Sequence, residues 1–106
     1  MRFDVEIPTC REGFLVPVNF ASPEEVIQTI QLAERLGYHA VWGTDFISPT
    51  HSRLATNQQQ PNWHEIMMTL AYAAAVTTKV KLASGVIVLP HRDPIILAKQ
   101  IATLDQ

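Results

Sequence analysis

Residues 36–45 read Leu-Gly-Tyr-His-Ala-Val-Trp-Gly-Thr-Asp, a short run in which a helix ends and a strand begins. Gly37 is typical of the residue that follows the last turn of a helix. The apolar run at residues 39–43 comes directly after it, and a short apolar run in this position indicates a buried strand. Thr44 and Asp45 therefore lie where that strand is predicted to end.

The helix before Gly37 has a clear start. Residues 22–25 read Ser-Pro-Glu-Glu, which combines an N-cap serine, a proline at the first helical position and a glutamate that can complete a capping box. Apolar residues then recur every three or four positions, at Val26, Ile30 and Ala33. This spacing places them on one side of the helix, which we expect to face a core.

Earlier in the chain, residues 3–8 read Phe-Asp-Val-Glu-Ile-Pro. The alternation of apolar and acidic side chains predicts a strand that Pro8 ends. Residues 9–21 and 48–62 show no sustained periodicity and predict two long loops. The second is longer than an ordinary connection, and such long loops often carry function.

The second half of the chain repeats the strand and helix signals. Residues 62–65 read Asn-Trp-His-Glu, which predicts an N-cap at Asn62 and a helix through the alanine-rich stretch that follows. Residues 79–88 are rich in valine, leucine and isoleucine and predict a strand that is interrupted at Ser84-Gly85. Asp93-Pro94 predicts the cap of a last helix.

This order of elements predicts an α/β fold with parallel strands and crossover helices. Two architectures have such an order, an open doubly wound sheet and a TIM (β/α)8 barrel. Residues 9–13, the turn after the first strand, contain one glycine, so the glycine-rich phosphate loop of many doubly wound sheets is missing. A complete barrel has about 250 residues. The three units in these 106 residues therefore make at most part of one.

The composition excludes several classes of protein. The chain carries 8 Lys and Arg against 10 Asp and Glu, a net charge of −2, so it lacks the basic surface expected of a nucleic-acid-binding protein. A hydrophobic content of 47% with 17% charged residues is ordinary for a folded domain. Cys10 is the single cysteine, and neither a signal peptide nor an apolar run of about 20 residues is present. We therefore expect a cytoplasmic protein with no membrane partner.

The histidines do not predict a metal site. His64-Glu65 begins like a zinc-binding helix, but Met68 stands four positions after His64, so the His-Glu-x-x-His pattern is absent. The other histidines, at positions 39, 51 and 91, have no metal-ligand spacing. A metal-dependent hydrolase is therefore the weakest of the enzyme hypotheses.

Several motifs follow one another in a distinctive order along the whole chain. They are residues 36–42, Asp45, residues 70–82 (Leu-Ala-Tyr-Ala-Ala-Ala-Val-Thr-Thr-Lys-Val-Lys-Leu), His91-Arg92-Asp93-Pro94, Leu97-Ala98-Lys99 and Thr103-Leu104-Asp105. This order resembles the bacterial luciferase-like monooxygenase family. The resemblance implies a (β/α)8 barrel that uses FMN or a deazaflavin coenzyme for oxygenation or hydride transfer on a small-molecule substrate. It also implies that residues 1–106 are a single partial barrel domain, the first three βα units at the N-terminal side.

The resemblance further implies a cofactor site. Residues Ser84-Gly85-Val86 match the end of the family's third strand, where a non-proline cis peptide, here at Gly85-Val86, lies behind the ring of the cofactor. Asp45 matches an acidic position near the ring. The candidate cofactor-binding residues are thus Asp45, Ser84, Gly85 and Val86. Phe46 stands where the family commonly has a histidine, and a phenyl ring has no proton to transfer. Phe46 and Cys10 are the candidate substrate-binding residues, and no catalytic residue is assigned.

Simpler interpretations of the same residues stay open. Gly85 fits a bulge in a strand, and Asp45 fits a brace for its own loop. Arg92 fits either loop scaffolding or the mouth of the site. A second hypothesis for the whole chain is a truncated, non-catalytic half barrel that self-associates or pairs with another chain, because three parallel strands leave unpaired edges. We accordingly expect a homo-oligomer or completion by further barrel segments.

Overall fold

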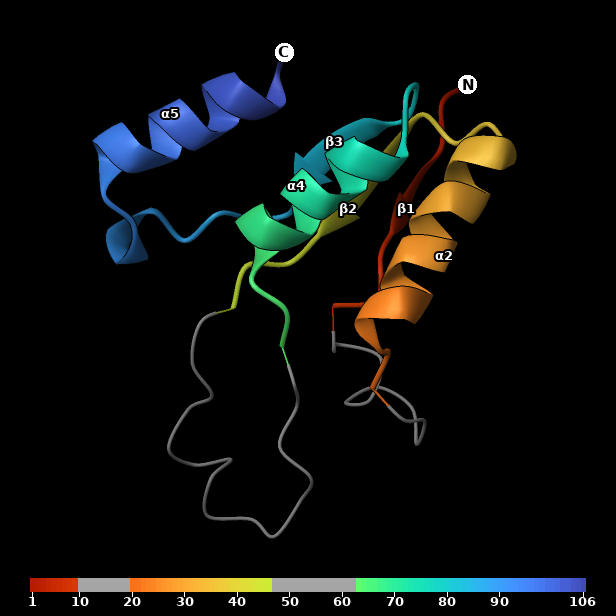
Figure 1. Cartoon of the computed structure of the whole chain (residues 1–106), viewed down its shortest axis with the longest axis horizontal. Helices are drawn as coiled ribbons and strands as arrows, with labels where there is room; N and C mark the ends of the chain where they lie inside the picture. The colour runs from red at the N-terminus through yellow and green to blue at the C-terminus, as the bar shows by residue number, and fades with distance from the viewer. Residues whose placement is uncertain (10–19, 47–62) are drawn as a thin grey trace, which may run out of the picture.

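The computed structural model describes residues 1–9, 20–46 and 63–106 (Figure 1). In chain order the elements are β1 (Asp4–Glu6), α2 (Pro23–Arg35), β2 (Ala40–Gly43), α4 (Ile66–Val76), β3 (Lys81–Ser84), the short 3-10 helix η1 (Leu89–His91) and α5 (Pro94–Leu104). Cys10 and most of the two predicted loops lie outside the described residues. Within the described ranges, no helix is long and apolar enough to cross a membrane.

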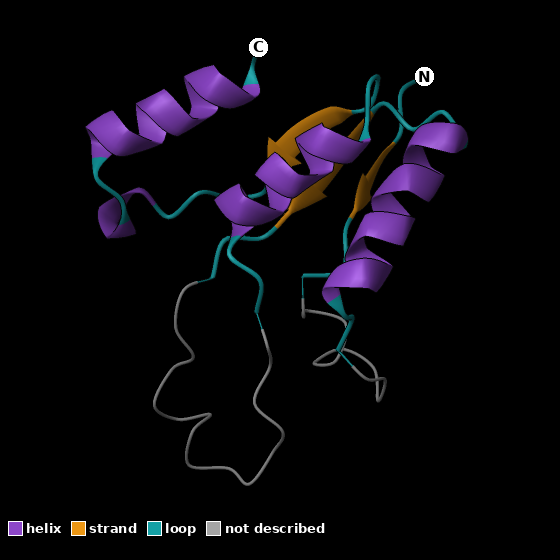
Figure 2. Ribbon diagram, viewed as in Figure 1, coloured by secondary structure: helices purple, strands orange, loops and turns teal. Residues whose placement is uncertain are grey.

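The described strands form one parallel sheet in the order β1-β2-β3 (Figure 2). Val5 pairs with Val41, and Val41 pairs with Leu82 on its other side. These three side chains therefore share one face of the sheet, and Trp42, the next residue of β2, lies on the opposite face. The predicted α/β arrangement, with parallel strands and a helix between successive strands, is confirmed.

Two helices, α2 and α4, pack on the same face of the sheet (Figure 1). The core between them and the strands consists of Ile7, Val26, Ile30, Ala33, Val41, Ala73 and Val80. It includes the three apolar residues that the helical spacing of α2 predicted. A second cluster, Ile66, Met67, Leu70 and Leu97, joins α4 to α5. The central strand β2 is thus fixed by helices that come before and after it in the chain.

Helix α2 begins and ends as its sequence predicts. The Ser22 hydroxyl accepts from the Glu25 amide at 3.2 Å, and the Glu25 carboxylate accepts from the Ser22 amide at 2.7 Å, which completes the capping box. The last helical residue is Arg35, Leu36 is the C-cap, and Gly37 has φ of +79°. Glycine adopts this left-handed conformation at no steric cost, which explains the sharp turn into β2.

The start of α4 differs from the prediction. The N-cap is Glu65, whose carboxylate accepts from the Met68 amide at 2.7 Å, and Asn62 lies outside the described residues. A glutamate side chain is long enough to reach this amide, and here its other oxygen is held by Arg92 at 2.6 Å. The helix therefore begins three residues later than a cap at Asn62 would have placed it.

Strand β3 is shorter than the predicted run of residues 79–88. On its amino side, one carboxylate oxygen of Glu34 accepts from three successive amides, those of Thr78, Lys79 and Val80, at 2.7, 2.6 and 3.1 Å. These contacts lower the pKa of Glu34, chiefly through the hydrogen bond from Thr78. On its carboxyl side, the amide of Val88 donates to a side chain as well. Amides bound to the Glu34 carboxylate cannot join a strand ladder, so β3 begins only at Lys81, and it ends at Ser84.

Candidate functional site

The three strands end at the same edge of the sheet, the carboxyl edge, where parallel barrels gather their chemistry. Thr9 follows β1, Thr44 and Asp45 follow β2, and Gly85 follows β3. The Thr9 and Thr44 hydroxyls lie 2.9 Å apart, and the Gly85 amide donates to the Gly43 carbonyl at 2.8 Å. The structure thus brings together the strand ends that the sequence placed at one site.

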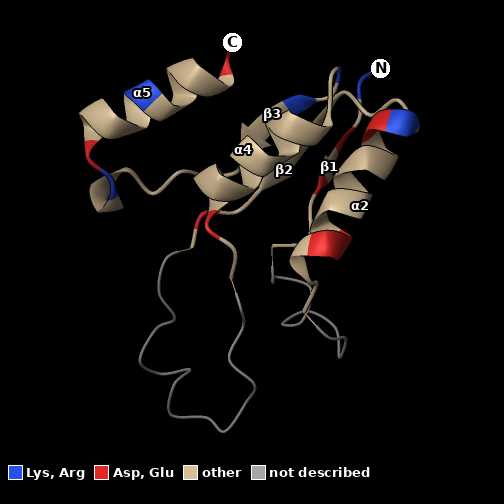
Figure 3. Cartoon of the chain, in the orientation of Figure 1, with Lys and Arg blue, Asp and Glu red and all other residues tan. Residues whose placement is uncertain are grey.

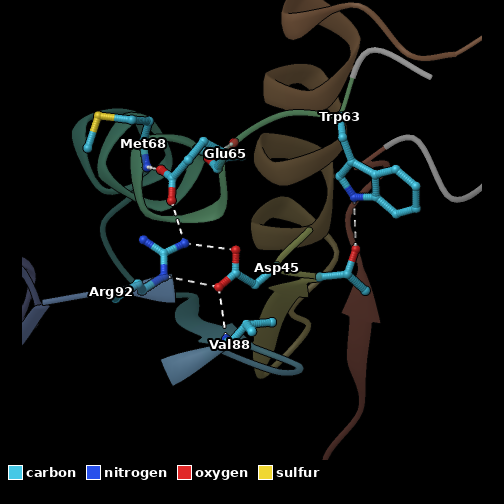
Figure 4. Close-up of polar contacts among 8 residues, drawn as sticks. Asp45, Trp63, Glu65, Met68, Val88 and Arg92 are labelled. Atoms are coloured by element: carbon cyan, nitrogen blue, oxygen red, sulfur yellow. Dashed lines mark hydrogen bonds and ion pairs between the residues drawn. The ribbon is translucent and has the colours of Figure 1, made fainter. Parts of the chain in front are cut away.

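Asp45 lies buried at this edge, with 7% of its surface exposed. Its Oδ2 accepts from the Val88 amide at 2.9 Å and from Arg92 Nε at 3.0 Å, and its Oδ1 accepts from Arg92 Nη2 at 2.8 Å (Figure 4). Two parallel hydrogen bonds between a guanidinium and a carboxylate form the strongest common type of side-chain ion pair. Both oxygens of Asp45 are therefore engaged by the protein itself.

The charge state of this pair follows from its surroundings. Burial on its own raises the pKa of the Asp45 carboxyl, but the hydrogen bonds from Arg92 and the Val88 amide outweigh it and hold that pKa below its usual range. The same contact with Asp45 raises the pKa of Arg92, and Glu65 adds to the effect. Asp45 and Arg92 are consequently both charged at neutral pH.

Arg92 connects three parts of the chain. Besides Asp45, its Nη2 donates to Glu65 Oε1 at 2.6 Å, and Glu65 is the N-cap of α4. Figure 4 shows the guanidinium between the two carboxylates, one after β2 and one before α4. Sequence reasoning singled out Asp45 but paired neither Arg92 nor Glu65 with it. The available signal was a buried acid that needed a cation, and Arg92 belongs to the His91-Arg92-Asp93-Pro94 motif.

The segment after β3 has the backbone geometry that the resemblance implied, because the Gly85-Val86 peptide is cis. Gly85 packs against the indole of Trp42: a Cβ built on Gly85 would lie 2.9 Å from Trp42 Cε3. A side chain at this position would therefore displace Trp42. Val86 has the opposite environment, with 66% of its surface exposed.

An aromatic pair lies at the same edge, beside β2. The rings of Phe46 and Trp63 stack with their centroids 4.2 Å apart and an interplanar angle of 28°. Trp63 Nε1 donates to the Thr44 hydroxyl at 3.3 Å, which ties the indole to the end of β2 (Figure 4). Phe46 thus lies at the carboxyl edge of the sheet. Cys10, the other candidate for this role, lies outside the described residues.

Charged and metal-binding groups are distributed as follows. Lysines and arginines are spread over separate elements of the part that is drawn in colour (Figure 3). Among residues 1–9, 20–46 and 63–106, no group of three or more His, Cys, Asp or Glu side chains is placed to hold a metal ion.

His64 has a structural contact. Its ring nitrogen Nε2 lies 3.3 Å from the carbonyl oxygen of Ala21, which links the start of α4 to the start of α2.

The chain is similar to several known proteins. The model of the luciferase-like monooxygenase family matches residues 1–106. Proteins called luciferase-like monooxygenase from Escherichia coli K12 and from Escherichia coli O6:H1 are each 32% identical to it over 75 residues, which cover 71% of this chain. The chain spans 20% of the length of these relatives.

A solved structure has the same fold. The crystal structure of monooxygenase RslO1 from Streptomyces bottropensis superimposes with a TM-score of 0.64 at 24% sequence identity. The match covers 99% of this chain and 29% of the other. At this identity the likeness concerns the fold, and it identifies the three parallel βα units as part of a TIM barrel.

Proposed function

Because this chain belongs to the luciferase-like monooxygenase family along residues 1–106, we propose that it forms one part of the cofactor site of a flavin- or deazaflavin-dependent oxidoreductase. When bound, the cofactor supplies the redox chemistry, either oxygenation or hydride transfer on a small-molecule substrate. The protein contributes position, hydrogen bonds and exclusion of water. Since the chain corresponds to 29% of the length of RslO1, the remaining walls of the site come from further barrel segments or a second chain.

The observation that carries this proposal is the exposed apolar side chain of Val86 at the carboxyl edge of the sheet. A flavin or deazaflavin ring is planar and largely apolar, and it needs a flat apolar support on one face. The cis segment Ser84-Gly85-Val86 supplies such a support, because Gly85 rests on Trp42 and Val86 is turned outward. These residues therefore fit one face of the ring.

The other candidate residues take distinct roles in this proposal. Asp45 has both carboxylate oxygens engaged, so it supports the ring through the backbone at Val88 rather than as a free acceptor. Phe46, stacked on Trp63, forms an apolar wall for the substrate. Cys10 is retained as a second wall residue from its position after β1.

The test is a fluorescence titration of the 106-residue chain with FMN and, separately, with a deazaflavin coenzyme, with the assembly state followed by light scattering. We expect saturable quenching with one of the two, which also identifies the cofactor. Val86→Ser should weaken this binding roughly tenfold, because burying an exposed valine side chain contributes about 1.5 kcal/mol or more. Leu36→Ser is the matched control, since Leu36 is 67% exposed and is the C-cap of α2, before β2 begins. Equal affinity of wild type and Val86→Ser contradicts the proposal.

The second candidate function is a non-catalytic half barrel that self-associates or pairs with another chain. Its support is the outer edge of β3, which pairs with no other strand in the described part of the chain. A groove of about 720 Å³ runs along this edge and is lined by α4, β3 and α5, with Leu70, Leu82 and Ile101 among its residues. An unpaired strand edge beside apolar side chains favours association. A monodisperse monomer in sedimentation velocity would exclude this function.

A further inference from the structure

We propose that Arg92 is a positioning residue of the cofactor site, and that it acts through Asp45 on the backbone of residues 84–88. This inference rests on the proposed function for its ring-binding part, since residues 84–86 are the proposed support of the ring. It concerns a residue that touches neither ring nor substrate. Three observations support it: the link from Arg92 to the segment, the fixed orientation of the guanidinium, and the burial of the ion pair.

The link consists of two consecutive contacts. Arg92 holds the Asp45 carboxylate at two points, through Nε at 3.0 Å and Nη2 at 2.8 Å. The same Oδ2 that binds Nε accepts from the Val88 amide at 2.9 Å. Val88 comes two residues after Val86, so the position of the proposed ring support is tied to the end of β2 through this carboxylate.

The guanidinium is fixed by a third contact, to Glu65 at the start of α4. Because Nη2 bonds both Asp45 and Glu65, the planar group cannot turn without breaking a contact on β2 or on α4. Lysine has a single nitrogen and no planar fork, so it cannot reproduce the two-point contact with Asp45. A positive charge alone is therefore not sufficient at this position, and the geometry requires arginine.

The burial of the cluster separates positioning from direct binding. The side chain of Arg92 is 12% exposed and that of Asp45 is 1% exposed. One cation lies between two carboxylates, so its positive charge is more than compensated by the protein itself and is not directed at a cofactor. We therefore assign its effect on the cofactor to the backbone that Asp45 holds at Val88.

The experiment compares Arg92→Met, Arg92→Lys and wild type in the 106-residue chain. The control is Arg35→Met, which removes an exposed arginine from the last turn of α2. The first readout is hydrogen exchange at the Val88 amide, followed by NMR without cofactor. The second is the affinity for FMN and for a deazaflavin coenzyme, with the absorption spectrum of the bound form. Arg92→Lys keeps the charge and serves as the test variant if Arg92→Met does not fold.

We expect Val88 to exchange about tenfold faster or more in both Arg92 variants, while the amide of Ile30 in the core of α2 keeps its wild-type rate. This size of increase is expected because the loss of one partner from a buried ion pair strongly destabilises the local structure. Cofactor affinity should fall by a similar factor, with Arg92→Lys between Arg92→Met and wild type. A general loss of stability would instead accelerate exchange at Ile30 as well.

The possible results separate the two proposals. An unchanged rate at Val88 overturns the role of Arg92, whatever the cofactor does. A faster rate at Val88 with wild-type cofactor affinity and spectrum also overturns it, and leaves the proposed function standing. If wild type binds neither cofactor, the proposed function fails. A selectively faster rate at Val88 then still supports Arg92 as the residue that positions the segment.

Discussion

Asp45 and Arg92 are 47 positions apart in the chain, yet they meet in a two-point ion pair at 2.8 and 3.0 Å. The pair joins the end of the central strand to the loop that precedes α5, and Glu65 extends it to α4. The second and third βα units therefore share one electrostatic contact at the edge where the proposed cofactor site lies. Its contribution to stability can be measured apart from any activity.

Asp45→Asn should lower the free energy of unfolding by about 2–4 kcal/mol, because it leaves the buried Arg92 guanidinium with an incomplete partner. Urea unfolding followed by circular dichroism measures this change. Asp4→Asn is the control, since Asp4 is an exposed residue of β1 and should change stability by less than about 0.5 kcal/mol. Equal losses in the two variants would show that the ion pair contributes nothing of its own.

The stability should depend on acid pH through Asp45. The folded state holds the pKa of this carboxyl below the value of about 3.9 that it has in an unfolded chain. Its contribution is therefore complete above the unfolded pKa and is lost as the pH falls through the folded pKa. The difference in unfolding free energy between wild type and Asp45→Asn should be constant near neutrality and shrink below about pH 4. Urea titrations at several pH values test this, and a difference that stays constant down to about pH 2 would contradict it.

Gly43→Ala should destabilise the chain by about 1–3 kcal/mol through overpacking. A Cβ at this position would lie 2.6 Å from Ile66 Cδ1 and 3.0 Å from Thr9 Cγ2. The second substitution Ile66→Val removes the clashing methyl group, so the double variant should be more stable than the sum of the two single changes predicts. Thermal and urea unfolding of the four proteins measure this coupling. Strict additivity would rule out the clash as the cause.

Glu34→Gln should increase hydrogen exchange at the amides of Thr78, Lys79 and Val80. All three donate to one oxygen of the Glu34 carboxylate, and an uncharged amide oxygen is a weaker acceptor. Exchange measured by NMR at neutral pH tests the prediction residue by residue. Glu24→Gln, in the first turn of the same helix, should leave these three rates unchanged. If both variants behave alike, the Glu34 contact does not restrain the turn before β3.

Much of the fold follows from local sequence signals, and the structure shows why. The capping box of Ser22 and Glu25 and the left-handed Gly37 involve neighbours within a few positions, so α2 and its end were predictable. The start of α4 was predicted wrongly at Asn62. Its actual cap, Glu65, is held partly by Arg92, which lies 27 positions later. A contact over that distance leaves no periodic pattern in the sequence.

The candidate site shows the same division. The position of Asp45 after an apolar run was sufficient to place it at the carboxyl edge. Its engagement with Arg92 could not be predicted, because no local spacing relates the two residues. The packing of Gly85 on Trp42 could not be predicted either, and it decides which residue of this segment is suitable for a mutational test of cofactor binding. A bulky residue at Gly85 would disturb Trp42 along with any cofactor, whereas the side chain of Val86 is 66% exposed.

A carboxylate accepts hydrogen bonds from the backbone on each side of the third strand. Glu34 accepts from the three amides that precede β3, and Asp45 accepts from the amide of Val88, which follows β3. Sliding a strand by one residue exchanges its two faces, so register is the property that such contacts protect. Because the backbone is held on both sides of β3, Lys81–Ser84 pairs with β2 in a single register. Among the strands that the structure describes, none pairs with the outer edge of β3. Any strand that continues the sheet there, from the same polypeptide or from another, must therefore align with β3 in one register.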